Sequence, residues 1–275
     1  QAAKLILYSL GAILFLSVLV GKSPLYFLSG LGALTAVLLL VFKDPIMGLI
    51  AGIQISSNDL IRIGDWIEMP SHNANGTVKD ISLTTLKVEN WNQTISSIPM
   101  QSLITNSFKN WRDMSMSGGR RIKRSIIIDT NSVDFIDQKT FKNLKEVPLI
   151  KDYLENKLKE IEAYNNNDFK KVRIQRKLTN IGVFRKYCLE YLKNNPRINS
   201  EMTLIVRQLE PKGLGIPIEI WTYSNTTNWI EYEEIQSDVF DHLFSVLKTF
   251  NLRAYQRPNG KDFSFEGNHP AKIDQ

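Results

Sequence analysis

The sequence predicts a membrane protein in which transmembrane helices are followed by a small β domain and then by a cytoplasmic α+β domain. Three observations lead to this prediction. The apolar residues of the 275-residue chain are concentrated before residue 57. Between residues 60 and 98, apolar and polar side chains alternate, as they do in half-buried strands. After residue 117, helix-like and strand-like segments are mixed. We therefore expect three domains, at residues 1–57, 58–116 and 117–275.

The longer apolar segment, residues 25–42, carries no charge and reaches the roughly 18 residues that a membrane span needs. Small residues lie among its leucines and valines and would let neighbouring helices approach closely. These residues are Gly30, Gly32, Ala33 and Ala36.

This segment is interrupted by Lys43, Asp44 and Pro45. Proline offers no N–H to the helix and disfavours helical geometry in the residue before it, so we expect a kink or a break there. Helical spacing then resumes, with the glycines on another side. The apolar positions are Ile46, Leu49, Ile50 and Ile53, and the glycines are Gly48 and Gly52. A close-packing span, a break and an angled amphipathic helix are typical of a pore-lining element, so we expect copies of this segment to form a membrane pore.

The first apolar segment, residues 5–20, is followed by a turn signal at residues 21–24, so we expect two antiparallel spans. The lengths make a buried helix pair in a soluble protein the less favoured alternative. Because the chain begins with Gln1, we expect a fragment that further membrane helices precede. Lys43 and Arg62 lie just past the second span and favour a cytoplasmic C-terminal part. The single cysteine, Cys188, fits a reducing compartment.

The β domain is predicted from short alternating segments. Residues 61–69 alternate with period two, and Asn75-Gly76 predicts a hairpin turn. Further strands are expected at residues 77–81, 84–88 and 94–98, with a turn or short helix at 101–106. Several short strands at this spacing indicate a small β-barrel or a sandwich.

The α+β domain is predicted to begin after a break at residues 117–119, Ser-Gly-Gly. We expect strands at 120–129, 203–209 and 216–223. We expect helices at 137–145, 149–163, 181–194 and 232–250, with a loop at 165–168.

The net charge of +6 raises the question of an anionic partner. Four cations, Arg120, Arg121, Lys123 and Arg124, fall in one predicted strand. A solvated strand face is the favoured interpretation, and contact with lipid head groups or another subunit is the alternative. We expect no nucleic-acid partner, because no groove with interleaved aromatic residues accompanies the charge.

No pattern of catalytic or metal-ligating residues stands out. Asp238 and His242 lie four residues apart on a predicted helix, but further ligands at matching positions are missing, so we expect packing or a surface pair. Cys188 is expected in the core, since no histidine partner is near in sequence. We therefore expect no cofactor, no metal and no enzymatic activity.

The chain resembles the small-conductance mechanosensitive channel (MscS) family, and most closely its miniconductance, YbdG-like branch. The family motifs are the small-residue helix with its amphipathic continuation and, after it, residues 62–67, 75–78, 84–88 and 97–99. The branch motifs are residues 108–112, 117–124, 215–220, 232–233 and 240–242. The sequence departs from the family's best-known member at Asp44-Pro45, where a glycine is usual. Residues 259–275 do not supply an obvious final strand.

The resemblance implies a homoheptamer in the bacterial inner membrane, with membrane lipids, other copies of the chain, ions and small osmolytes as its partners. It implies a channel opened by membrane tension that releases ions and small solutes on hypo-osmotic shock. A non-conducting, membrane-anchored scaffold is the alternative; a membrane-bound enzyme is disfavoured because no catalytic constellation is present.

The expected gate lies on the span at residues 25–42, where Ala33, Ala36, Val37 and Leu40 share one helical stripe. The family's hydrophobic seal corresponds to Ala36 and Leu40, and a narrow apolar ring blocks ions by excluding water. Lys43 and Asp44 are expected to form charged rings at the cytoplasmic mouth, or else to extend to the membrane interface or pair with each other. The expected hinge residues are Asp44, Pro45 and Gly48.

Overall fold

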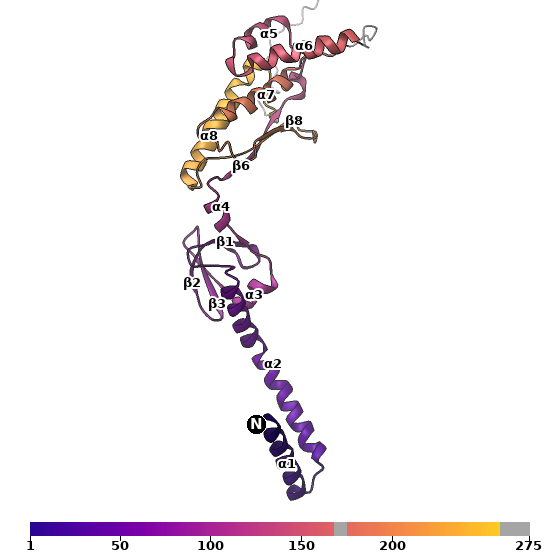
Figure 1. Ribbon diagram of the computed structural model, residues 1–275, viewed down its shortest axis with the longest axis vertical. Helices are drawn as coiled ribbons and strands as arrows, with labels where there is room; N and C mark the ends of the chain where they lie inside the picture. The colour runs from indigo at the N-terminus through magenta and orange to yellow at the C-terminus, as the bar shows by residue number, and fades with distance from the viewer. Residues whose placement is uncertain (168–174, 259–275) are drawn as a thin grey trace, which may run out of the picture. The chain divides into compact units, whose positions relative to one another are not determined.

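The computed structural model describes residues 1–167 and 175–258. The prediction that residues 259–275 supply no obvious final strand concerns residues outside these ranges. The chain divides into two compact units, the first spanning Gln1–Asp113 and the second beginning at Met114. The first unit holds two long helices and a β domain, and the second is an α+β unit (Figure 1).

Two apolar helices, α1 (Ala2–Val20) and α2 (Pro24–Ser57), open the first unit as a hairpin (Figure 1). Gly21 ends α1 in the left-handed conformation, with φ of 66°, and its N–H donates to the Ser17 carbonyl. Pro24 begins α2 at a position where its missing N–H costs nothing. Both helices are long and apolar enough to cross a membrane. The predicted helical hairpin is confirmed.

Of the predicted kink or break at Asp44-Pro45, the break is wrong, because α2 continues through Pro45 as one helix of 34 residues; the kink stays a prediction. Proline removes only its own N–H from the helical hydrogen bonds, and a helix can absorb this loss locally. The residues on both sides keep helical spacing, so the amphipathic segment extends the span rather than forming a separate helix.

The β domain is a five-stranded antiparallel sheet in the order β4-β3-β2-β1-β5. Its elements are β1 (Trp66–Met69), β2 (Ala74–Ile81), β3 (Thr85–Asn90), β4 (Ile95–Pro99), helix α3 (Met100–Thr105) and β5 (Lys109–Asn110). The alternation of its strands buries one set of side chains, which pack together with Ala51 and Ile55 of α2. The core of this domain therefore includes the end of the long helix.

The hairpin predicted at Asn75-Gly76 is also wrong, because both residues lie inside β2, where they pair with Glu68 and Ile67. The turn lies earlier, in the 3-10 helix η1 (Pro70–His72), and Asn73 closes it with φ of 50°. A side chain at Gly76 would overlap the carbonyl oxygen of Glu89 on β3. The glycine thus serves a close approach of two strands and not a turn.

The α+β unit contains a three-stranded antiparallel sheet in the order β6-β8-β7. Its strands are β6 (Arg121–Ile128), β7 (Ile205–Gln208) and β8 (Ile216–Tyr223). Its helices are α5 (Gln138–Lys145), α6 (Lys151–Asn167), α7 (Asn180–Lys193) and α8 (Trp229–Val246), and α4 (Arg112–Met116) leads into the unit. Short 3-10 turns occupy Thr130–Ser132, Pro148–Ile150 and Leu247–Phe250. Since α6 extends to Asn167, the loop predicted from residue 165 begins too early; Asp168 lies outside the described residues.

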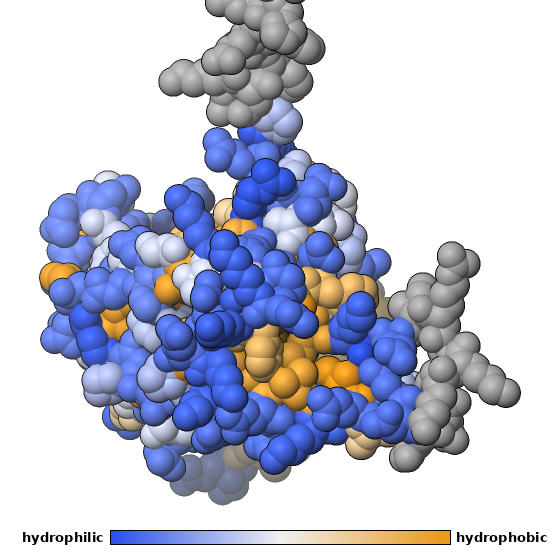
Figure 2. Space-filling view, turned by 90° about the horizontal axis from the view of Figure 1, so that it is seen from above, coloured by the Kyte–Doolittle hydropathy of each residue, from blue (hydrophilic) through white to orange (hydrophobic). Residues whose placement is uncertain are grey.

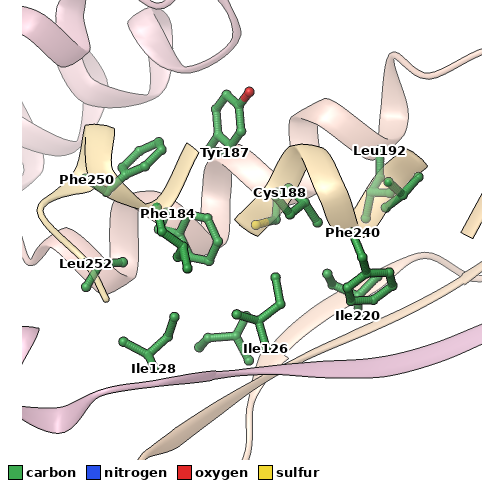
Figure 3. Close-up of a cluster of buried hydrophobic side chains, with 14 of the residues drawn as sticks. Ile126, Ile128, Phe184, Tyr187, Cys188, Leu192, Ile220, Phe240, Phe250 and Leu252 are labelled. Atoms are coloured by element: carbon green, nitrogen blue, oxygen red, sulfur yellow. The ribbon is translucent and has the colours of Figure 1, made fainter. Parts of the chain in front are cut away.

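The core of this unit lies between the sheet and helices α7 and α8. Ile126 and Ile128 of β6 point toward Phe184 and Cys188 of α7 and Phe240 of α8 (Figure 3). Cys188 is fully buried, and burial raises the pKa of its thiol. Its predicted place in the core is confirmed.

We expect Gly76→Ala to destabilise the β domain by about 3 kcal/mol or more, because the new Cβ forces β2 and β3 apart. Thermal unfolding of the detergent-solubilised chain measures this loss. Gly11→Ala is the matched control, since a Cβ there meets no atom within 4 Å. An unchanged melting temperature for Gly76→Ala would contradict the observed pairing of β2 with β3.

Candidate functional site

The apolar part of α2 is left largely exposed by the described residues of the chain, although α1 lies against one side of it. Its most apolar 18-residue window is 0% buried, and Leu40 is 74% exposed. On the α+β unit, by contrast, Figure 2 displays mostly hydrophilic side chains around one apolar area. An apolar surface of this length on one helix requires lipid or other copies of the chain to cover it.

The predicted gate residues lie along α2 with the spacing i, i+3, i+4 and i+7. Ala33, Ala36, Val37 and Leu40 are all exposed, and so is Lys43, just beyond them. None of these five side chains belongs to a hydrophobic core of the described residues. A single chain therefore presents these residues on one side of a helix. One chain alone does not enclose a pore with them.

The C-terminal part of α2 is docked on the β domain. Ala51 and Ile55 are each 1% exposed, and Gly48 is buried. A Cβ added at Gly52 would lie 2.8 Å from the carbonyl oxygen of Leu83, in the loop between β2 and β3. A Cβ added at Gly48 would lie 3.9 Å from the methyl group of Thr84. The two glycines, one turn apart, form the contact surface of the helix with this loop.

The predicted hinge residues thus fall into two environments. Asp44 and Pro45 lie in the exposed part of α2, whereas Gly48 faces Thr84 at the edge of the docked part. The transition from a free to a fixed helix occurs between Pro45 and Gly48. Sequence analysis noted Gly52 but gave it no role, although its spacing from Gly48 was a signal of close packing.

A network of charged and amide groups holds the chain where α2 ends. Asp65 has a side chain only 8% exposed and accepts hydrogen bonds from Arg112 Nε at 3.0 Å, Asn110 Nδ2 at 2.9 Å and the Arg62 N–H at 2.8 Å. Arg112 also donates to the Asp59 carbonyl at 3.1 Å, and the guanidinium of Arg62 pairs with the Asp59 carboxylate. The network joins the residue after the helix cap to the last strand of the β domain.

The charge state of this network follows from its hydrogen bonds. Burial alone raises the pKa of Asp65, but the donors from Arg112, Arg62 and Asn110 outweigh it, so the pKa of Asp65 is lowered. Asp65 is therefore ionised at neutral pH. Sequence analysis gave Asp65 and Arg112 no role, because 47 residues separate them and no local pattern links them.

The other residues singled out from the sequence have structural partners. Asp238 pairs with Arg197 at 2.7 Å, and His242 Nε2 lies 2.7 Å from the Tyr187 hydroxyl, so the two residues are not partners of each other. The predicted packing role of His242 is confirmed. Among the described residues, no group of three or more His, Cys, Asp or Glu could hold a metal ion.

A hairpin of apolar helices, a β domain built onto the end of the second helix and a following α+β unit define a membrane protein with the MscS-like fold. A family model described as "Mechanosensitive ion channel, beta-domain" matches residues 44–113. This range begins inside α2, four residues before Gly48, where the docked part of the helix starts, and ends one residue beyond Arg112. The match therefore covers both the docked helix and the Asp65 network.

Curated relatives and solved structures agree with this assignment. The low conductance mechanosensitive channel YnaI of Escherichia coli is 23% identical over 223 residues, which are 81% of this chain and 48% of the relative. The small-conductance mechanosensitive channel MscMJ of Methanocaldococcus jannaschii is 27% identical over 57% of this chain and 41% of its own length. The chain thus spans about half or less of the curated relatives that it matches.

Two solved structures show the same fold. Arabidopsis thaliana MSL1 aligns with a TM-score of 0.61 at 13% identity, covering 93% of this chain and 74% of that one. The closed state of Helicobacter pylori MscS aligns with a TM-score of 0.55 at 14% identity, covering 94% and 81%. The family model, the relatives and these structures together support membership of the MscS family.

We expect Gly52→Ala to weaken the docking of α2 by about 1–3 kcal/mol, because the Leu83 carbonyl must move. Gly48→Ala is the matched variant: its Cβ makes an ordinary contact with Thr84, and alanine favours the helix by up to about 1 kcal/mol. Thermal unfolding in detergent compares the two. Equal effects of both substitutions would contradict the close contact at Gly52.

We expect Asp65→Asn to cost about 1.5–3 kcal/mol at pH 7, since it removes charge-assisted hydrogen bonds. The folded pKa of Asp65 is lowered, so its contribution is present above the unfolded value of about 3.9 and is lost as the pH falls through the folded value. Denaturant unfolding at pH 7 and at pH values below 4 measures the difference between wild type and variant. Asp59→Asn, at a 49% exposed carboxylate, is the control with the smaller effect. A difference that does not shrink in acid would contradict this assignment.

Proposed function

We propose that the chain is a subunit of a mechanosensitive ion channel that membrane tension opens, releasing ions and small solutes on hypo-osmotic shock. The observation that carries the proposal is the division of α2, whose first part is apolar and uncovered and whose last part is fixed to the β domain. The similarity to YnaI and MscMJ, both named as mechanosensitive channels, supports it.

In this proposal, copies of α2 surround a pore, and the stripe of Ala33, Ala36, Val37 and Leu40 seals it. Apolar side chains around a narrow axis exclude water, and ions then cannot cross. Lys43 forms a ring of positive charge at the cytoplasmic mouth. The small side chains of the stripe, beside Gly30 and Gly32, let the helices pack closely enough to close the axis.

Tension favours the state that occupies more area in the membrane, so the exposed parts of α2 tilt or rotate apart and the pore wets. The hinge is formed by Asp44, Pro45 and Gly48, where the exposed part of the helix meets the docked part. Pro45 supports this role because its missing N–H leaves the helix with one hydrogen bond fewer at this point.

We further propose a homoheptamer in the bacterial inner membrane, with the α+β region in the cytoplasm and membrane lipids around the helices. Ions and small osmolytes are the permeating partners. Within the family, we place the chain nearest the miniconductance, YbdG-like branch, with domains at residues 1–57, 58–116 and 117–275. The branch rests on the sequence motifs alone.

A non-conducting scaffold anchored by two helices is the second candidate. An anchor requires neither a stripe of small residues nor a span that continues into the core of the next domain, so these features favour the channel. Recording from the purified chain in a stretched bilayer separates the two, because only a channel produces conductance steps. The mass of the solubilised assembly gives the number of copies.

We expect Leu40→Ser to lower the tension at which the channel opens, because a hydroxyl in the seal lets water enter the closed pore. Patch recording under graded suction measures the threshold. Leu38→Ser is the matched control: Leu38 is 47% exposed on α2, but about 200° around the helix from Leu40 at 100° per residue. An unchanged threshold for Leu40→Ser would remove Leu40 from the seal.

A further inference from the structure

The sheet of the α+β unit is covered on one face only by the described helices. Ile122, Ile126 and Ile128 of β6, with Ile218 and Ile220 of β8, point into the core beneath α7 and α8. Figure 1 shows both helices on the same side of these strands. The alternate residues of each strand point the other way.

The uncovered face carries aromatic, aliphatic and basic side chains, and we call it the basic sheet face. Across the three strands, Lys123 pairs with Trp221, which pairs with Ile205. In neighbouring rows, Arg121 and Arg207 add two further cations. The basic sheet face therefore consists of Arg121, Lys123, Ile205, Arg207 and Trp221.

Two of these cations have no acidic partner within the described residues. The guanidinium carbon of Arg121 lies 4.9 Å from the Trp221 ring, and Lys123 Nζ lies 5.0 Å from it. Arg207, by contrast, pairs at 2.9 Å with Glu219, whose side chain is 6% exposed. The surface thus combines a central tryptophan with uncompensated positive charge. Tryptophan and arginine are the residues that most often carry the binding energy of protein interfaces.

The outer side of α8 carries the opposite charge, and we call it the acidic helix face. Glu231, Glu234, Asp238 and Asp241 recur at helical spacing, and all four are exposed. Arg197 pairs with Glu234 at 3.0 Å and with Asp238 at 2.7 Å. Asp241 has no cationic partner in the described part of the chain, so the face keeps a net negative charge.

The two faces point in opposite directions. Val239 and Leu243 of α8 are fully buried toward the sheet, and the acidic stripe lies on the other side of the helix. One two-layer unit therefore presents positive charge on one outer face and negative charge on the other. Such faces cannot meet within one chain, but they complement each other between two copies.

We propose that the basic sheet face of one chain docks onto the acidic helix face of the next copy. The contact is head-to-tail, and contacts of this kind close into rings when the rotation between neighbours fits. Opposite charges select this orientation, because turning either copy around would place like charges together. The inference rests on the proposed self-assembly of the channel and names the surfaces that join the cytoplasmic units.

Charge reversal tests the pairing on the full chain in detergent, with native mass spectrometry at fixed protein concentration. Lys123→Glu and Asp241→Lys are each expected to lower the assembled fraction, by about tenfold in the association constant. The double variant restores it, because the pair is rebuilt with its signs exchanged. Lys159→Glu, an exposed lysine of α6, is the control without effect. Failure of the double variant to restore assembly, or no effect of either single variant, overturns the proposal.

Cysteine cross-linking tests the geometry independently of charge. With Lys123→Cys and Asp241→Cys in one chain, mild oxidation is expected to produce a ladder of linked copies, and each single variant none. Cys188 is fully buried and contributes no link. If the double-cysteine chain produces conductance steps but no ladder of linked copies, this interface is rejected and the proposed channel function is retained. A monomer without conductance rejects the proposed function as well, and dimers from a single variant reject the head-to-tail arrangement.

Discussion

The structure depends on one constraint: α2 carries a long apolar surface that the described chain leaves largely exposed. Water penalises this surface in proportion to its area, at about 25 cal/mol for each Å². Only lipid or other helices of the same kind remove the penalty. The remaining features of the first unit follow from it, because the β domain fixes the end of α2 and leaves its apolar part free to meet a membrane and other copies.

The attachment of α2 combines two kinds of contact with different consequences. Ala51 and Ile55 belong to the core of the β domain, so the end of the helix cannot leave without opening that core. Gly52, against the Leu83 carbonyl, fixes the depth and rotation of the helix, because any larger side chain would displace it. The helix end and the β domain therefore move as one body. Only the part of α2 that is N-terminal to Gly48 is free to move relative to the β domain.

Much of this architecture could be predicted from periodicity. The two spans, the alternating strands of the β domain and most elements of the α+β unit followed from the spacing of apolar residues. The wrong predictions concern residue types that occur in two different structural contexts. Gly76 resembles a turn residue but permits a close strand contact, and Pro45 resembles a helix end but lies within a helix. The Asp65 network was missed because its partners are distant in sequence. The predicted gate residues do not come together within the described part of one chain.

The pair between Asp65 and Arg112 closes the β domain between its entry and its exit. Arg112 also binds the carbonyl of Asp59, the first residue after the helix cap. These bonds join the segment that enters the β domain directly to the segment that leaves it, without passing through the five strands. Drawing the two ends of the domain apart would therefore require breaking the bonds of Arg112 as well as those between strands.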